Sequence, residues 1–286
     1  MEKATSTPRA DKLAEAHELL VSAVEQITTG EDWARMLEVA GRFTRYSFGN
    51  VMLIAIQRPD ATRVAGYRTW QSMGRQVRKG ERGIRIMAPC RYVEGVVTND
   101  DGSEHTLYGI RGFTTVSVFD LAQTDGDDLP NVGPALLDGD GVTGLWDALA
   151  SQVVGRGYTL VRGDCHGANG VTEHETRTVR VRGDVSEAQA TKTLAHELAH
   201  VLMHPEAVAY HACRGRSEVE AESVAYLVCR SAGLPTDGYT FPYVAGWGGG
   251  DADKVRETAD AAIRTARVIL EALESQQPAE QLRAVA

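Results

Sequence analysis

The chain has 286 residues, of which 43% are hydrophobic, and a formal net charge of −9 at pH 7. This length predicts two domains, and no apolar run approaches the length of a membrane span. The first residues lack the apolar core of a signal peptide, so the sequence predicts a soluble, cytoplasmic protein without a membrane partner. The four cysteines are far apart, and we expect them to be reduced.

Positive charge is concentrated in one part of the chain. Residues 33–92 contain 12 Lys and Arg but only 3 Asp and Glu, a balance of +9. The rest of the chain must then carry −18 to give the total of −9. Such an asymmetry indicates a nucleic-acid-facing region on an otherwise acidic protein.

Apolar residues at helical spacing predict three helices near the N-terminus, over 11–27, over 32–43 and from Ser47 to about Gln57. A short strand or turn leading into a helix is expected over 64–70. Residues 75–86 predict a glycine-bent β-hairpin with Val77, Ile84 and Ile86 facing inward. Residues 93–130 should continue the domain as strands, with a hairpin turn at 99–102.

Basic and aromatic side chains alternate in this first half. Arg and Lys can bind phosphates, and aromatic rings can stack on bases. The same composition also fits arginines on a solvated face above an aromatic core, and composition alone leaves the two open. The candidate DNA-binding residues are Arg45, Tyr46, Tyr67, Arg75, Arg78, Lys79 and Arg82.

The second half begins after a stretch rich in Asp, Gly and Pro, which predicts a linker over 131–142. A helix is expected around 145–153, and strands at 159–162 and 176–181 flank a Gly-rich turn. Apolar residues at helical spacing predict a terminal helix over 251–275. The tail from 276 to 286 should be disordered.

The segment from Thr191 to Glu222 carries the strongest chemical signal. His196, Glu197 and His200 form the pattern His-Glu-x-x-His, and residues four apart lie on one face of a helix. In zinc hydrolases with this pattern the histidines bind the metal, and the glutamate is the general base towards the metal-bound water. A surface helix with two solvated histidines is the alternative, but the flanking residues are mostly apolar.

A second helix should supply the third ligand. Glu218 and Glu222 share a helix face, whereas Glu220 points about 200° away from Glu218. We expect Glu218 to bind Zn²⁺ and Glu222 to accept the second ring N–H of a ligand histidine. Glu220 is the alternative ligand.

Other potential ligands lie near these helices. Cys213 and Cys229 leave a cysteine ligand open. His204 continues the row of His200 by one turn, but it comes too early to be an easy third ligand on the same straight helix. We therefore expect a structural or rim position for His204.

Several segments resemble known families. HELAHVLMH (196–204) and EVEAESVAYLV (218–228) resemble the ImmA/IrrE-like zinc metallopeptidase domain. Upstream, YSFGN (46–50), GYRTW (66–70) and GRQVRKGERGI (74–84) resemble the N-terminal domain of ArdC-type antirestriction proteins. The resemblance covers roughly residues 10–130 and 185–250. It implies single-stranded-DNA binding without strong sequence preference, but not which residues touch DNA.

The sequence thus predicts an α+β protein. A helical and β-hairpin single-stranded-DNA-binding domain is expected over 1–130, and a zincin-like metallopeptidase domain over 143–275. One hypothesis is an antirestriction-type DNA-binding protein of a plasmid, phage or other mobile element, in which the zinc can be structural. The other is a metallo-endopeptidase that cleaves a repressor or other protein partner and is targeted by DNA. Glu197 favours retained hydrolytic chemistry, because a structural site needs no base.

Overall fold

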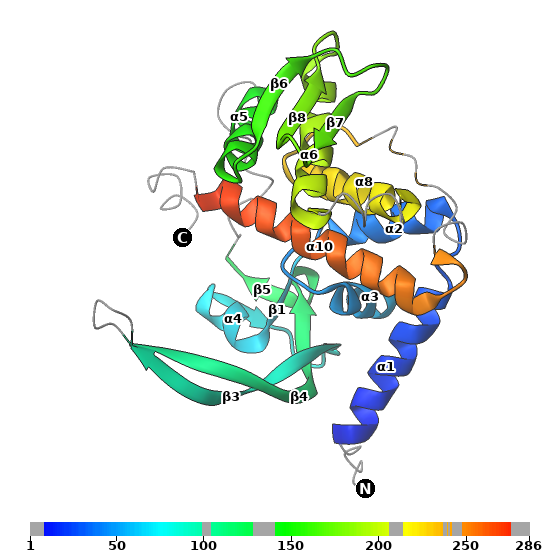
Figure 1. Ribbon diagram of the computed structural model, residues 1–286. Coiled ribbons are helices and arrows are strands. Elements are labelled where there is room, and N and C mark those ends of the chain that lie inside the picture. The colour runs from blue at the N-terminus through cyan, green and yellow to red at the C-terminus, as the bar shows by residue number, and fades with distance from the viewer. Residues whose placement is uncertain are drawn as a thin grey trace, which may run out of the picture. The chain divides into compact units, whose positions relative to one another are not determined.

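The computed structural model describes residues 9–98, 104–127, 141–205, 214–236, 239, 241 and 248–275, and it is an α+β fold (Figure 1). The chain divides into two compact units. Unit 1 comprises Met1–Ala23 and Gly49–Asp127, and unit 2 comprises Val24–Phe48 and Asp128–Ala286. Residues 24–48 thus group with the second unit by their contacts. None of the described helices is both long enough and apolar enough to span a membrane.

Unit 1 is built on two small sheets. Strands β1, β4 and β3 form an antiparallel sheet in the order β1-β4-β3, and β2 pairs antiparallel with β5. The strands are β1 (Val64–Gly66), β2 (Arg75–Val77), β3 (Ile84–Thr98), β4 (Glu104–Asp120) and β5 (Thr124–Gly126). The unit also contains α4 (Tyr67–Ser72), the 3₁₀ helix η1 (Leu121–Gln123), and most of α1 (Arg9–Glu25) and α3 (Phe48–Gln57). The predicted turn at 99–102 lies outside the described residues.

The prediction of a β-hairpin over residues 75–86 is wrong. In β2, Val77 lies opposite Thr124 of β5, whereas Ile84 begins β3 and lies opposite Val118 of β4. Val77, Ile84 and Ile86 are all buried, as the alternation indicated. Alternation reports which face of a strand is buried, but it does not report which strand is its partner.

Asp120 connects three backbone segments of unit 1. Its side chain lies at the end of β4 and is 1% exposed. Oδ1 accepts hydrogen bonds from the N–H groups of Thr62 (2.8 Å) and Arg63 (3.1 Å), and Oδ2 accepts one from Ala122 (2.9 Å). The carboxylate thus holds the segment before β1 and the start of η1 against β4.

We expect Asp120→Ala to lower the free energy of unfolding of the full chain by roughly 2–5 kcal/mol, because three backbone donors lose a buried, charged acceptor. Denaturant unfolding would measure this loss. Asp125→Ala is the matched control, since its side chain is 72% exposed and lies 3.4 Å from Arg78. That change should cost less than about 1 kcal/mol. Equal losses in the two variants would contradict the role given to Asp120.

In the described part of unit 2, a three-stranded sheet packs with five helices. The central strand β8 (Thr178–Arg182) pairs parallel with β6 (Thr159–Gly163) and antiparallel with β7 (Gly170–Glu173). The sequence had indicated only a Gly-rich turn where β7 lies. The helices are α2 (Gly30–Ala40), α5 (Gly141–Gly155), α6 (Glu187–Met203), α8 (Arg214–Ser231) and α10 (Ala252–Ser275). The predicted tail, 276–286, and most of the predicted linker lie outside the described residues.

Helix α2 belongs to unit 2 because its apolar face is buried there. Trp33 is completely buried, and its Nε1 donates a hydrogen bond to Ser223 Oγ of α8 at 2.9 Å. From α10, Arg267 donates to the backbone carbonyls of Thr44 (2.8 Å) and Tyr46 (2.6 Å). Two helices from the far end of the chain therefore hold residues 30–46.

Helix α6 lies at the centre of unit 2, in contact with α5, α8, β7 and β8 (Figure 1). Its N-cap is Ser186, whose Oγ accepts from the Gln189 N–H at 3.3 Å. The Gln189 side chain donates a hydrogen bond to Thr193 Oγ1 at 3.2 Å. Leu194 and Leu198 are completely buried, so the helix is fixed in rotation about its axis.

Candidate metal centre and nucleic-acid surface

Helices α6 and α8 bring three potential metal ligands to one point. On α6, the Nε2 atoms of His196 and His200 are 3.0 Å apart. On α8, Glu218 Oε2 lies 3.4 Å from His196 Nε2 and 3.9 Å from His200 Nε2. In the part of the chain that the structure describes, these residues form the one group of three or more His, Cys, Asp or Glu side chains that could hold a metal ion.

The spacing of these atoms fits a four-coordinate metal ion. Tetrahedral ligand bonds of about 2.0–2.1 Å place neighbouring donor atoms about 3.3–3.4 Å apart. The observed separations of 3.0, 3.4 and 3.9 Å bracket this value. Three protein ligands leave a fourth position open, which is typical of catalytic rather than closed structural zinc sites.

Glu222 holds His196 from the side away from this point. His196 Nδ1 lies 3.0 Å from Glu222 Oε2, and the other carboxylate oxygen lies 3.2 Å from Lys192 Nζ. Burial alone would raise the pKa of Glu222, but its contacts with His196 and Lys192 outweigh burial and lower that pKa. A charged carboxylate at the second ring nitrogen fixes the orientation of a ligand histidine.

The pKa values of the two histidines are shifted in opposite directions. Burial, together with the positive charge of His196, lowers the pKa of His200 to about 3. Burial also opposes charge on His196, but hydrogen bonds to Glu218 and Glu222 outweigh it and raise the pKa of His196 to about 10. The carboxylates therefore stabilise a positive charge at this point, as a metal cation requires.

Glu197 is held beside the cluster by strand β7. The residue is 5% exposed, and its Oε2 accepts a hydrogen bond from Thr172 Oγ1 at 2.7 Å. Burial raises the pKa of the Glu197 carboxyl group, which suits a group that accepts a proton. A Cβ at Gly170 would lie 2.6 Å from Glu197 Oε1, so only glycine lets β7 approach this closely. Sequence reasoning missed Thr172 and Gly170, because only the pairing of β7 brings them here.

The alternative ligands lie elsewhere. Glu220 Oε2 is 2.9 Å from His204 Nε2, and Glu220 Oε1 accepts from Arg216 Nε at 2.9 Å. Cys229 is buried, and burial raises the pKa of its thiol to about 11, which disfavours the thiolate that a metal needs. Cys213 lies outside the described residues. Among the candidates that are described, Glu218 is the one that reaches the two histidines.

Three candidate DNA-binding residues line one open cleft of about 840 Å³ in unit 1: Tyr67, Arg78 and Lys79. Tyr67 is 43% exposed and packs edge-to-face against Phe119, with ring centroids 6.4 Å apart. Arg78 pairs with Glu81 at 2.9 Å, which leaves its charge partly compensated. The cleft thus combines an accessible aromatic ring with an exposed lysine.

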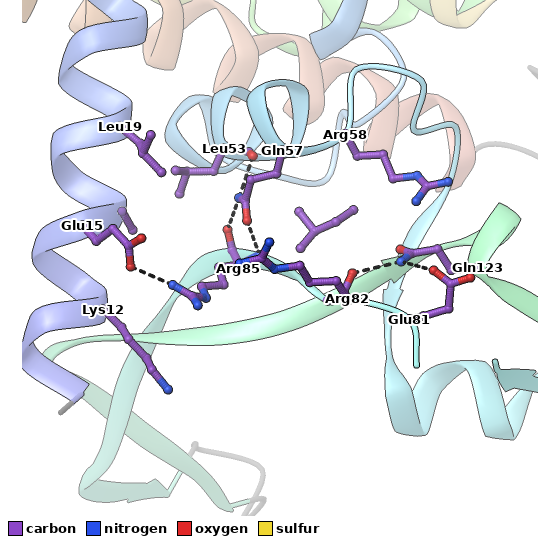
Figure 2. A pocket seen from close by; sticks show the side chains of 13 residues that line it. Lys12, Glu15, Leu19, Leu53, Gln57, Arg58, Glu81, Arg82, Arg85 and Gln123 are labelled. Carbon is purple, nitrogen blue, oxygen red and sulfur yellow. Dashed lines mark hydrogen bonds and ion pairs between the residues drawn. The ribbon is translucent and has the colours of Figure 1, made fainter. Parts of the chain in front are cut away.

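Arg82 lines a neighbouring pocket of about 410 Å³, which shares Glu81 with the cleft. Figure 2 shows that this pocket lies between α1, α3 and the segment leading into β3, with an ion pair from Arg85 to Glu15 at 2.7 Å. The Gln57 side chain donates a hydrogen bond to the backbone carbonyl of Arg85 and accepts one from the backbone N–H of the same residue. These hydrogen bonds and the ion pair hold the residues that line this pocket in place.

The other candidate DNA-binding residues lie outside the cleft. Arg75 donates from its guanidinium to the carbonyls of Thr124 and Gly126, so it ties β2 to β5. Arg45 and Tyr46 belong to unit 2, where Arg45 lies 3.5 Å from Glu274. The aromatic residues of the sequence motifs also differ in exposure, since Trp70 is completely buried and donates to the Phe119 carbonyl at 2.9 Å.

Two family models match parts of the chain. Residues 10–119 match the model of the N-terminal domain of anti-restriction factor ArdC, and residues 156–229 match the IrrE N-terminal-like domain. The two matches fall in the two parts of the chain in which the HELAHVLMH segment and the basic N-terminal motifs resemble these families.

The individual proteins that match this chain have low sequence identity to it. An uncharacterized protein of Bacillus anthracis is 25% identical over an aligned length of 295 positions. The alignment covers 86% of this chain and 50% of the relative, so the chain spans half the length of that relative. Two crystal structures of the antirestriction protein ArdC from plasmid R388 also match, each with 19% sequence identity to this chain. The metal-free structure has a TM-score of 0.46 over 80% of this chain and 86% of that chain. The Mn(II)-bound structure has a TM-score of 0.47 over 85% and 99%.

We expect His196→Ala and Glu218→Gln each to reduce bound divalent metal from about one ion per chain to nearly none, because each removes one of three protein donors. Elemental analysis after dialysis against Zn²⁺ would measure the content. Glu197→Gln is the matched control, since it alters a carboxylate next to the cluster without removing a ligand. Full metal content in the His196 and Glu218 variants would refute the ligand assignment.

Proposed function

We propose that the chain is a single-stranded-DNA-binding protein of the antirestriction type, of a plasmid, phage or other mobile element, whose second unit holds a divalent metal ion. The observation that carries this proposal is the combination, in one chain, of the ArdC N-terminal match over 10–119 with the His196, His200 and Glu218 cluster in the IrrE-like half. Each half supplies chemistry that the other lacks.

Zn²⁺ is the metal that we propose for the cluster. Imidazole nitrogens suit zinc, and two histidines with one glutamate are a known catalytic zinc set. His196, His200 and Glu218 would hold the ion, and Glu222 would orient His196. Such an ion acts as a Lewis acid and lowers the pKa of water. Glu197 would take up the proton.

Single-stranded DNA is the ligand that we propose for the cleft in unit 1. Between residues 75 and 85 the chain carries five Arg and Lys but one Glu, which favours a polyanion. Tyr67 offers an exposed ring for base stacking, and stacking tolerates any sequence. Because Arg75 and Arg78 are engaged in internal bonds, we assign phosphate contacts chiefly to Lys79 and Arg82.

We expect the double variant Lys79→Gln/Arg82→Gln to bind a labelled single-stranded oligonucleotide more weakly. The slope of log K against log salt should fall by about 1.4, because two phosphate contacts are lost. Fluorescence anisotropy of the full chain over a salt series, with a duplex in parallel, would measure this. The double variant Arg256→Gln/Arg264→Gln on α10 removes the same charge as a control. An unchanged slope in the first variant would move the DNA surface elsewhere.

A metallo-endopeptidase that cleaves a repressor or other protein partner is the second candidate function, with DNA binding as its targeting. Glu197 favours it, because a metal site that only stabilises the fold needs no buried glutamate with a raised pKa beside the open position. The contact of Glu197 with Thr172 orients the carboxylate further.

We expect Glu197→Gln to retain bound Zn²⁺ but to lose hydrolysis by about 10²–10⁴-fold, the contribution typical of general base catalysis. Mass spectrometry of a peptide library, incubated with Zn²⁺-loaded protein and with the variant, would detect Glu197-dependent products. Their absence at equal metal content would contradict the peptidase function and leave the metal a structural role.

A further inference from the structure

We propose that His204 is a positioning residue for the metal ligand His200, and that Glu220 and Arg216 complete this support. This inference rests on the proposed metal centre. His200 Nδ1 lies 3.0 Å from His204 Nδ1, His204 Nε2 lies 2.9 Å from Glu220 Oε2, and Arg216 Nε donates to Glu220 Oε1 at 2.9 Å. Four side chains thus form one continuous hydrogen-bonded series that begins at a metal ligand.

The series is buried where it meets the ligand. The side chains of His200, His204 and Glu220 are 5%, 9% and 8% exposed, and Arg216, at the far end, is 31% exposed. Hydrogen bonds are stronger in such surroundings, and buried polar groups must be matched in donor and acceptor. A single arrangement of protons therefore has to satisfy every link.

The positions of the protons follow from the groups at the two ends of the series, Arg216 and His200. Arg216 is always a donor, and a carboxylate accepts on both oxygens, so His204 must donate to Glu220 from Nε2. A neutral imidazole with its proton on Nε2 accepts on Nδ1. His200 must then donate from its own Nδ1, which leaves a lone pair on His200 Nε2. This is the nitrogen that faces His196 and Glu218.

Both ligand histidines are therefore supported by carboxylates of α8, but by different routes. Glu222 lies one turn after Glu218 and reaches His196 Nδ1 directly at 3.0 Å. Glu220 lies about 200° around the helix from Glu218, where its carboxylate meets His204. His204, the C-cap residue of α6 and four residues after His200, spans that distance.

The experiment measures Zn²⁺ affinity of the full chain by competition with a chromophoric chelator. We expect Glu220→Gln to weaken binding by about 10–100-fold, as is typical when the support of a ligand histidine is lost. The Gln amide can donate to His204 and so permit the reversed proton order, which places an N–H on the metal-facing nitrogen of His200. Glu257→Gln is the matched control, because Glu257 also meets Arg216, at 3.7 Å, but its side chain is 60% exposed. Its affinity should be unchanged.

Two substitutions of His204 separate positioning from packing. His204→Gln keeps an acceptor and a donor in one side chain and should retain most of the affinity. His204→Leu has a similar volume but neither group, and it should lose about 10–100-fold. Because Co²⁺ absorption reports ligand geometry, its spectrum should change in the Leu variant more than in the Gln variant. Unfolding of the metal-free proteins checks that each variant is folded.

The outcomes are distinguishable. If the wild-type chain fails to bind Zn²⁺, the proposed metal centre itself is refuted. If it binds, and His204→Leu and Glu220→Gln bind as tightly, the positioning role alone is overturned. An equal loss in Glu257→Gln would also overturn it, because the effect would then follow the charge on Arg216 and not the series.

Discussion

The packing of α6 against α8 is the constraint on which the candidate metal centre depends. Leu194 and Leu198 on α6, and Val224 on α8, are completely buried, so neither helix can rotate without exposing apolar surface. With both rotations fixed, His196, His200 and Glu218 point to one position. Core packing of the two helices thus holds the donor atoms at separations of 3.0–3.9 Å.

Three glutamates of α8, Glu218, Glu220 and Glu222, alternate with single residues, yet their surroundings differ. Glu218 faces the two histidines, Glu222 contacts the back of His196, and Glu220 contacts His204 and Arg216. Helical rotation of about 100° per residue explains this separation. Each of the three carboxylates meets a group that is positively charged or can donate a hydrogen bond. These contacts offset the repulsion among the three like charges.

The basic character of unit 1 is less available to ligands than its composition suggests. Arg75 bonds to backbone carbonyls, Arg78 pairs with Glu81 and Asp125, and Arg85 pairs with Glu15. Counting charges along the sequence cannot separate these arginines from cations that are available to phosphate. Because of this internal bonding, fewer cations remain as candidates for nucleic-acid binding. Of these, Lys79 lines the open cleft and Arg82 lines the neighbouring pocket.

The sequence by itself determined the features that depend on near neighbours. The four-residue spacing of His196 and His200 places both imidazoles on one face of any helix, and the same rule made Glu218 and Glu222 the preferred partners over Glu220. Helix positions and the inward side of Val77, Ile84 and Ile86 also follow from local period. These properties are local because a helix or strand fixes side-chain direction within a few residues.

Tertiary structure alone decided which distant segments meet. It paired β2 with β5 rather than with the start of β3, and it grouped residues 24–48 with unit 2 through the contact of Trp33 with Ser223. It also brought Thr172 to Glu197 and linked His204 to Glu220. Such contacts depend on chain segments far apart in sequence. An amphipathic pattern states that a face is buried, but the element that covers it is chosen by the packing of the whole unit.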